Sequence, residues 1–322
     1  MKEIGILANY LTPAHTARIE ETAAKGGYTI RYYKDAEDAA ANIGTAEILY
    51  GYFPAPLLKK ADSLKWFHTA SAGVDPFLAD DVYPHPGVIL TNSNGSYGTT
   101  ISEHMIMVTL MMMRRMPAYF EVTKERKWVN LGSMRSIQGS TFAVLGTGDI
   151  GTTFARKIKA LGAAKVIGVR RDLSKPSDPA FDEVYLFTDV KKAIADVDVV
   201  AMAMPSTKQT VGLISEDVLT AMSPRTLIVN VGRGSAIDQD ALIHALNEDR
   251  LAGAALDVMT PEPLPADSPL YDAKNLLLTP HVSGNMSLAY TCDVNVAAFC
   301  RNLLRYFNGE KLHHLVDRVI GY

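Results

Sequence analysis

The sequence predicts an α/β protein with two doubly wound parallel-sheet domains, and three observations support this fold class. Short apolar runs of β type alternate with helical segments along almost the whole chain. A glycine-rich turn, LGTGDIG, follows one of these runs near the start of a second alternating series. At 322 residues the chain is also long enough for two domains, each with its own core.

The first hundred residues form the first of these series. Helices are predicted near Ala14–Lys25 and Ala36–Ile43, between runs that read as strands. The predicted strands are EIGILAN, TIRYYKD, AEILYGY, LKWFHTA and GVILTNS. This alternation indicates a small parallel α/β unit.

A long helix is predicted next, from a cap at Thr99–Thr100 to Pro117. Its sequence, ISEHMIMVTLMMMRRM, is apolar nearly all round, so we expect it to be buried on several sides. Packing against a second subunit would bury it, and its methionines suit an adaptable interface. We therefore expect a homodimer, with burial inside a single chain as the alternative.

The second series begins at Ser140 and has the continuous apolar strands of a sheet covered on both faces. Its predicted strands are TFAVLGTG, AKVIGVRR, DEVYLF, VDVVAMAMP, TLIVNVG, AGAALDV and NLLLTP. A last helix is predicted over Leu288 to Asn308. The pattern is typical of a doubly wound domain.

Composition excludes several classes of function. The chain is 48% hydrophobic and 21% charged, and its net charge of −3 gives no reason to expect binding to nucleic acid or to an anionic membrane. The N-terminal MKEIGILANY lacks the apolar region of a signal peptide, so we expect a cytoplasmic protein. Cys292 and Cys300 have no metal-ligand spacing, and we expect buried thiols and no metal site.

Three polar residues each come just after a β-type run: Arg233 in LIVNVGRGS, Glu262 in ALDVMTPEPLP and His281 in LLLTPHVSG. Ligands bind at the carboxyl ends of the strands in open parallel sheets, so these residues could meet in one crevice. An arginine can bind a carboxylate, a histidine can move a proton, and a glutamate can orient that histidine. Taken singly, each residue could instead be a solvated turn arginine, a loop charge or a structural histidine. The set of three favours function.

The turn LGTGDIG has the spacing of a dinucleotide-binding loop, with Gly146, Gly148 and Gly151 between a strand and a helix. The first glycine permits the tight turn, the second admits a pyrophosphate to the backbone, and the third lets helix and strand pack closely. The amides of Asp149 and Ile150 would then face the phosphates at the helix N-terminus.

The next strand predicts which nucleotide is preferred. The acid that usually binds the adenosine ribose would stand about 20 residues beyond the glycines, but Arg170 and Arg171 occupy this place. Paired guanidinium groups attract a 2′-phosphate, so we expect NADP, with NAD as the alternative. In that alternative the arginines are solvated and Asp172 binds the ribose.

These motifs, in this order, resemble those of the D-isomer-specific 2-hydroxyacid dehydrogenases over nearly the whole chain. The resemblance implies reversible reduction of a 2-oxo acid to a D-2-hydroxy acid, with Arg233, Glu262 and His281 as the catalytic residues. It also implies that the C-terminal helix returns to the first unit. A Rossmann domain of residues 100–287 would then be inserted into a smaller, discontinuous, flavodoxin-like substrate domain of residues 1–99 and 288–322.

Further cofactor contacts follow from the same resemblance. AMPSTKQT is similar to the family's loop over the adenine and ribose, which implicates Pro205 and Thr210. Val231 and Gly232 precede the catalytic arginine. Asp257 matches the aspartate near the nicotinamide carboxamide, and a capping aspartate is the competing interpretation.

The resemblance also implies a substrate site in the N-terminal domain. HTASAGVD is similar to the family's carboxylate-binding loop, with the backbone amides of Ala72, Gly73 and Val74 as donors. Tyr52 stands at the position of the pocket-lining residue. An ordinary glycine turn and a partly buried tyrosine are the structural alternatives.

Three competing functions are weighed against this interpretation. Glu262 argues against a formate dehydrogenase, because those enzymes have glutamine there. A phosphoglycerate dehydrogenase would favour a basic residue in the loop before AGVD, whereas TASAGVDP contains no basic residue. Such enzymes also often have a regulatory domain after the catalytic part, and here the sequence stops at Tyr322, so this function is disfavoured. A nucleotide-sensing scaffold or corepressor on the same fold stays open, as does the identity of the 2-oxo acid.

Overall fold

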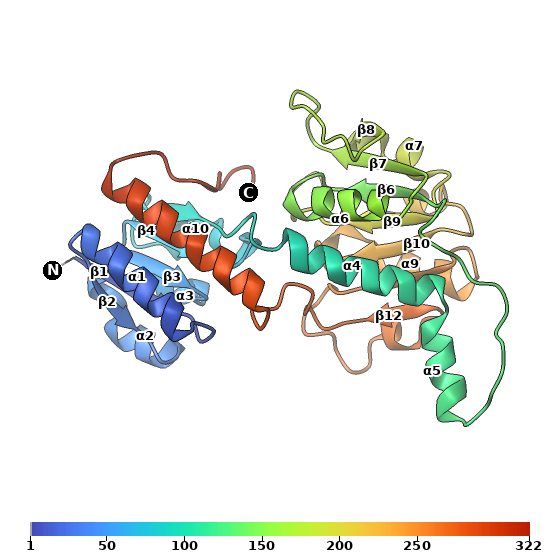
Figure 1. Cartoon of the computed structure of the whole chain (residues 1–322), viewed down its shortest axis with the longest axis horizontal. Coiled ribbons are helices and arrows are strands. Elements are labelled where there is room, and N and C mark those ends of the chain that lie inside the picture. Colours follow the sequence, from blue (N-terminus) through green and yellow to red (C-terminus); the bar gives the residue numbers. More distant parts are fainter. Residues whose placement is uncertain (1) are drawn as a thin grey trace. The chain divides into compact units, whose positions relative to one another are not determined.

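The computed structural model describes residues 2–322, and the chain divides into two compact units (Figure 1). Unit 1 consists of the residues up to Tyr97 together with Asn285–Tyr322, and unit 2 consists of Gly98–Gly284. The expected boundaries at 99/100 and 287/288 lie within three residues of these divisions. The C-terminal segment therefore belongs to the same unit as the N-terminal strands.

Unit 1 is built on a five-stranded sheet in the order β2-β1-β3-β4-β5, with every pair parallel. This is the flavodoxin-like order, with its switch point between β1 and β3. All five predicted strands are present. They are β1 (Glu3–Leu7), β2 (Thr29–Tyr32), β3 (Ile48–Gly51), β4 (Trp66–Thr69) and β5 (Ile89–Thr91).

Helices cover both faces of the unit 1 sheet. On one face α1 (Pro13–Lys25) packs against α10 (Ala289–Phe307), and on the other lie α2 (Ala36–Asn42) and α3 (Ala55–Leu58). Successive residues of a strand point to opposite faces, so Leu49 joins the core under α2 and α3. The next residue, Tyr50, joins the core under α1 and α10 and stacks on Phe299 at 4.1 Å between ring centroids.

Unit 2 contains a seven-stranded parallel sheet in the order β12-β11-β10-β9-β6-β7-β8. The strand order reverses between β6 and β9, which makes this edge the switch point of a Rossmann-type sheet. Each of the seven predicted strands is present. They are β6 (Thr141–Leu145), β7 (Lys165–Arg170), β8 (Glu183–Leu186), β9 (Val199–Met202), β10 (Leu227–Asn230), β11 (Gly253–Leu256) and β12 (Leu276–Leu278). The two-domain α/β fold class is confirmed.

Both faces of this sheet are also covered. On one face α4 (Gly98–Met113) packs against α6 (Asp149–Ala160), and together they cover β6, β7, β10 and β11. On the other face α7 (Val190–Ile194), α8 (Glu216–Leu219) and α9 (Gln239–Asn247) enclose the largest apolar core. Burial on both sides explains why the strands are apolar without alternation.

The prediction of one continuous helix to Pro117 was wrong. Helix α4 stops at Met113, and a separate helix, α5 (Met116–Lys124), begins after Arg115, whose φ of 57° is left-handed. Pro117 lies in the first turn of α5, where its missing N–H costs nothing. Burial of α4 is also one-sided, because Met105 is buried whereas Met107 is 47% exposed.

The longest helices are packed elements of the two units. Helix α10 has 19 residues and carries Asp293, Arg301 and Arg305. Helix α4 has 16 residues and lies on the sheet of unit 2. In residues 2–322 no helix is both long and apolar enough to span a bilayer.

Candidate active site

Three loops leave the same edge of the unit 2 sheet. Arg233 follows β10, Glu262 follows β11 and His281 follows β12. These strands are consecutive neighbours in the sheet, with Asn230 paired to Leu256 and Leu256 paired to Leu278. The loops that carry the three residues therefore begin side by side at the carboxyl ends of the strands.

Arg233 lies in a turn that the last residue of β10 braces. The side chain of Asn230, 1% exposed, accepts a hydrogen bond from the Gly232 amide and donates one to the Arg233 carbonyl, both at 3.0 Å. A Cβ on Gly232 would be 2.6 Å from the carbonyl oxygen of Met204, so only glycine allows this approach. The half-buried Arg233 donates to the Gly232 carbonyl at 2.7 Å. Asn230 was not predicted, although a polar residue ending the buried run LIVN was a usable signal.

Glu262 connects the arginine loop to His281. Its Oε1 accepts from the Met259 amide at 2.9 Å, and its Oε2 lies 2.7 Å from His281 Nδ1. Gly234, next to the arginine, packs on the same backbone, where a Cβ would come within 2.1 Å of the Met259 carbonyl carbon. An ionised carboxylate only accepts hydrogen bonds, so this contact places a hydrogen on His281 Nδ1 and leaves Nε2 outside the pair.

Asp257 holds the backbone on both sides of His281. Its carbonyl accepts from the His281 amide at 2.8 Å, and its buried carboxylate accepts from the amides of Val282 and Ser283, both at 2.9 Å. The φ of His281 is 53°, a conformation that residues other than glycine adopt only when their surroundings enforce it. These bonds involve both carboxylate oxygens and fit the capping interpretation of Asp257.

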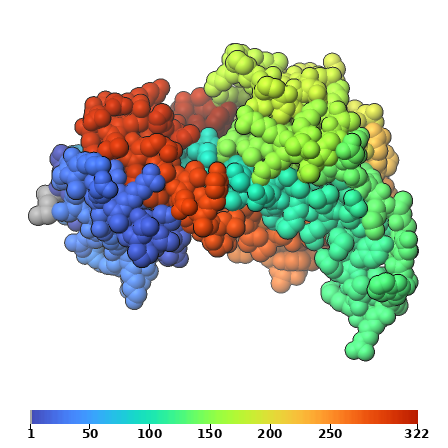
Figure 2. Space-filling model, in the orientation of Figure 1, coloured from blue at the N-terminus to red at the C-terminus, as the bar shows by residue number. Residues whose placement is uncertain are grey.

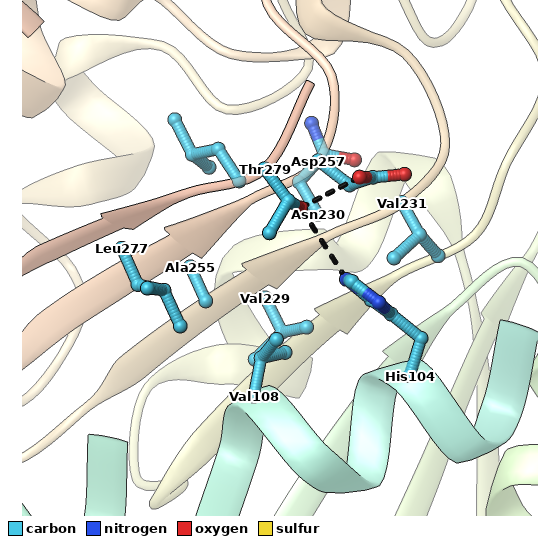
Figure 3. Close-up of a pocket in the computed structure, with 10 residues that line it drawn as sticks. His104, Val108, Val229, Asn230, Val231, Ala255, Asp257, Leu277 and Thr279 are labelled. Atoms are coloured by element: carbon cyan, nitrogen blue, oxygen red, sulfur yellow. Dashed lines mark hydrogen bonds between the residues drawn. The ribbon is translucent and has the colours of Figure 1, made fainter. Parts of the chain in front are cut away.

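A narrow pocket lies behind this loop, between α4 and strands β10 to β12 (Figure 3). The Thr279 hydroxyl donates to Asp257 Oδ1 at 2.6 Å, and His104 Nε2 lies 3.4 Å from the same hydroxyl oxygen. Since the single hydroxyl hydrogen goes to the carboxylate, His104 must be the donor in the second contact. Burial lowers the pKa of His104 and so favours a neutral ring. The contact with Thr279 then places the single ring hydrogen on Nε2. His104 and Thr279 were both missed, because single polar residues in apolar runs carry no local motif.

The glycine loop after β6 has the geometry that its spacing predicts for a phosphate-binding turn. Gly146 has a φ of 96°, and a Cβ on Gly151 would be 1.9 Å from the Gly146 carbonyl oxygen. Gly148 caps α6, and no atom lies within 4 Å of the position where its Cβ would be. The loop is therefore closed on the protein side and open at Gly148, where a pyrophosphate would approach the start of α6.

The first residue of α6 carries a negative charge that a phosphate would repel if the two lay together. The carboxylate of Asp149 instead lies against the start of α4, where a Cβ on Gly98 would be 2.4 Å from Asp149 Oδ1. The N-terminus of that second helix favours a negative charge. The backbone amides of Asp149 and Ile150 can therefore serve a ligand independently of the Asp149 side chain.

The arginine pair stands at the end of β7. Arg170 is half-buried and donates to the carbonyls of Lys175 and Pro176 in the following loop, while Arg171 is exposed. Asp172 is bound within its own turn, where it accepts from the Ser174 amide and hydroxyl, both at 2.7 Å. These bonds lower the pKa of the Asp172 carboxyl. The turn gives Asp172 a local structural role, whereas the cationic groups lie where the adenosine ribose is expected.

The loop after β9, which is expected to lie over the adenine, is held by hydrogen bonds between its own residues. The Thr210 hydroxyl donates to the Pro205 carbonyl at 2.6 Å and accepts from the Thr207 amide at 2.8 Å. Thr210 is only 2% exposed, so its hydroxyl shapes the loop rather than facing outward. Val231, 7% exposed, lines the pocket behind the arginine turn.

In unit 1 the loop after β4 has its carbonyls turned toward the protein. The Ser71 carbonyl accepts from the Ser93 amide at 3.0 Å, that of Ala72 from Asn92 Nδ2 at 2.8 Å, and that of Gly73 from Ser71 Oγ at 2.6 Å. In a trans peptide the next N–H points the opposite way from the carbonyl. The amides of residues 72, 73 and 74 therefore face the other side of the loop, an arrangement that suits an anion. Asn92, which braces it, was not predicted.

Tyr52 lies beside this loop at the same sheet edge. It follows β3, whose Gly51 pairs with Thr69 of β4. The residue is 41% exposed, while its hydroxyl lies 3.0 Å from that of Tyr97. It is therefore an accessible aromatic side chain with an anchored hydroxyl.

Comparison with known proteins identifies relatives over the whole chain. Residues 106–283 match the family model "D-isomer specific 2-hydroxyacid dehydrogenase, NAD binding domain". A putative 2-hydroxyacid dehydrogenase of Haemophilus influenzae is 29% identical and covers 88% of this chain and 90% of its own length. A glyoxylate/hydroxypyruvate reductase B of Pectobacterium carotovorum is 29% identical and covers 81% of each chain.

Solved structures agree with this assignment. A D-isomer specific 2-hydroxyacid dehydrogenase family protein from Aeromonas salmonicida is 35% identical, with a TM-score of 0.86 over 98% of this chain and 99% of its own. An NADPH-dependent glyoxylate/hydroxypyruvate reductase from Sinorhizobium meliloti, solved with NADP and sulfate, is 25% identical, with a TM-score of 0.81 over the full length of both chains. The chain belongs to the D-isomer specific 2-hydroxyacid dehydrogenase family and is an enzyme with a nicotinamide nucleotide cofactor.

Proposed function

We propose that this enzyme reduces a 2-oxo acid to the D-2-hydroxy acid with NADPH, and that the reaction is reversible. The main support is the contact of 2.7 Å between His281 Nδ1 and Glu262 Oε2, because it orients a histidine that can donate a proton, just after the end of β12. Relatives named as glyoxylate/hydroxypyruvate reductases support the reaction class.

His281 is the proton donor in this proposal. The Glu262 carboxylate accepts from Nδ1 and so fixes the orientation of the ring, which leaves Nε2 to give a hydrogen to the substrate carbonyl oxygen. Asp257 sets the direction of the ring by gripping the backbone around it. A ring held in this way loses little freedom when the substrate binds.

Each unit offers donors for a substrate anion. In unit 2 Arg233 binds the carboxylate and polarises the carbonyl, which stabilises the charge that develops on oxygen during reduction. In unit 1 the amides of Ala72, Gly73 and Val74 are a further set of donors for a carboxylate, because the carbonyls of Ser71, Ala72 and Gly73 are tied to the protein.

The residues around the glycine loop fit a dinucleotide. Gly148 leaves room for a pyrophosphate, and the amides at the start of α6 would bind it. Arg170 and Arg171 would pair with the 2′-phosphate of NADP and so select it over NAD. The bound nicotinamide supplies the hydride.

The test is a steady-state assay of the purified enzyme with a panel of 2-oxo acids and both cofactors. Reduction of at least one acid is expected in the wild type. His281→Ala should lower kcat by about 10²–10⁴-fold, because it removes general acid catalysis, while the Kd for NADPH stays the same. Near wild-type turnover in His281→Ala would refute the proposed role, and no turnover by the wild type would favour a nucleotide-sensing scaffold.

We also propose that the enzyme is a homodimer and that the arm formed by α5 and residues 125–137 meets a second copy. The arm projects from the body of unit 2 (Figure 2). The side chains of Phe120, Val129 and Met134 on this arm are each more than 40% exposed, and that of Trp128 is fully exposed.

Tryptophan fluorescence can test this interface, because the other tryptophan, Trp66, is fully buried. A red shift of the emission on dilution would report the release of Trp128 from the dimer. Trp128→Asp should yield a monomer in light scattering, and a wild-type monomer would refute the proposal.

A further inference from the structure

The backbone at His281 has a conformation that its surroundings must enforce. Its φ of 53° lies in the left-handed region, which is uncommon for residues other than glycine and persists only where neighbouring contacts hold it. The His281 amide donates to the Asp257 carbonyl at 2.8 Å. A relaxed backbone would carry the imidazole with it, so the contacts that hold this φ also decide where the ring lies.

The carboxylate of Asp257 is the centre of these contacts. Its Oδ1 accepts from the Val282 amide and its Oδ2 from the Ser283 amide, both at 2.9 Å. Two successive amides can be bound in this way only while the plane of the carboxylate keeps one orientation. A group that fixes the carboxylate therefore also fixes the backbone after His281.

A chain of two hydrogen bonds that begins on α4 ends on this carboxylate (Figure 3). The Thr279 hydroxyl donates to Asp257 Oδ1 at 2.6 Å, and His104 Nε2 donates to the Thr279 oxygen at 3.4 Å. The ring of His104 lies in a pocket lined by apolar side chains, among them Val108 and Val229. A polar group in such a place is costly unless it is hydrogen-bonded, and here its bond is directed toward the His281 loop.

We propose that Thr279 and His104 are positioning residues for proton transfer, which act through Asp257 on the backbone that aims His281. This rests on the proposed function, in which His281 gives a hydrogen to the substrate carbonyl oxygen. Glu262 holds the ring itself through Nδ1, whereas the chain from α4 holds the backbone that carries the ring. The chain should therefore affect kcat and leave the binding of substrate and cofactor almost unchanged.

The experiment compares two substitutions of Thr279 by steady-state kinetics with the best 2-oxo acid. Valine has nearly the shape of threonine but lacks the hydroxyl, so Thr279→Val should lower kcat about tenfold, the effect of one hydrogen bond to a charged group. KM for the acid and Kd for NADPH should stay nearly the same. Thr279→Ser keeps the hydroxyl and should retain most of the wild-type kcat, although it removes a methyl group.

Thr226→Val is the matched control for the loss of a buried hydroxyl. Thr226 is fully buried, directly precedes β10 and donates to the Val197 carbonyl at 2.7 Å. It stands at the end of that strand opposite to Arg233, so this variant should lower Tm but keep the wild-type kcat. A loss of kcat in Thr226→Val as large as that in Thr279→Val would show a general effect of destabilisation and would overturn the inference.

His104 is tested in a double-mutant cycle with Thr279. His104→Leu should lower kcat about threefold in the wild type, the effect of one weak neutral hydrogen bond, and should have no further effect in Thr279→Val. His104→Gln keeps an N–H donor and should recover part of the loss. If the losses in the two single variants multiplied in the double variant, the two residues would act independently and the chain would be refuted.

The remaining outcomes separate this inference from the proposed function. A wild-type kcat in Thr279→Val, beside a large loss in His281→Ala, would overturn the inference while the proposed function stands. A higher Kd for NADPH with an unchanged kcat would assign the chain to cofactor binding and would overturn it as well. Near wild-type turnover in His281→Ala would instead remove the proposed function on which the inference rests.

Discussion

The two units use the same edge of a parallel sheet for different chemistry. Unit 1 presents backbone amides at Ala72–Val74 and the neutral hydroxyl of Tyr52. Unit 2 presents the charged side chains of Arg233, Glu262 and His281 after three neighbouring strands. Recognition through amides depends on backbone shape, whereas proton transfer depends on side-chain identity. Substitutions should therefore have different effects in the two units.

The supports of the two sites are alike despite this difference. In unit 1 the buried Asn92 ties the Ala72 carbonyl, and in unit 2 the buried Asn230 braces the turn before Arg233. Each asparagine satisfies backbone groups that would otherwise be unpaired in the loop. Both loops thus rely on a buried polar residue that performs no chemistry of its own.

After His281→Ala, the next largest effect is expected for Arg233→Lys in unit 2. Lysine keeps the charge but loses the planar fork of the guanidinium, so kcat/KM for the best 2-oxo acid should fall about 10- to 100-fold. The control is the amide of that substrate, which should be poor with both enzymes. Wild-type kinetics in Arg233→Lys would mean that the unit 1 amides alone bind the carboxylate.

Glu262→Gln should lower kcat, though less than His281→Ala does. Glutamine keeps an oxygen that can accept from His281 Nδ1 but removes the negative charge from this pair at 2.7 Å, so kcat should fall about tenfold while KM stays nearly the same. The measurement is steady-state kinetics with the best 2-oxo acid. An equal kcat in Glu262→Gln and the wild type would separate Glu262 from proton transfer.

Arg170→Asp tests the cofactor preference of unit 2. One or two charge-assisted hydrogen bonds to the 2′-phosphate correspond to a preference for NADPH of at least about tenfold, which this change should abolish. The measurement is kcat/KM with both cofactors at fixed ionic strength. Asp172→Asn is the control and should leave the use of NADH unchanged, because Asp172 is bound to Ser174. A wild type that prefers NADH would assign the ribose to Asp172 instead.

Much of the fold could be predicted from periodicity and turns. All twelve strands were expected, since buried parallel strands and glycine turns are local signals. The return of α10 to unit 1 was expected only from the family resemblance. The break between α4 and α5 was missed, because a left-handed arginine at Arg115 has no marker in the sequence. Pro117 was taken as the end of one helix, whereas it lies in the first turn of the next.

The candidate site was only partly accessible from the sequence. Motif spacing could indicate Arg233, Glu262 and His281, because each follows a recognisable strand. Asn230 ends the buried run LIVN and could have been noticed there, whereas the bracing residues Asn92 and His104 had no such signal. Their partners are set by tertiary contacts, such as that of His104 with Thr279 across the pocket of Figure 3.

The smallest effect is expected for the loop of residues 72–74 in unit 1, in Asn92→Ala. Loss of one neutral hydrogen bond to the Ala72 carbonyl should loosen the loop and raise KM for the 2-oxo acid about two- to tenfold, with kcat nearly unchanged. The matched variant in unit 2 is Asn230→Ala, which disturbs the turn before Arg233 and should lower kcat as well. The comparison is made by steady-state kinetics, with Tm as a check on folding. If both variants lowered kcat equally, the division between a binding edge in unit 1 and a chemical edge in unit 2 would not hold.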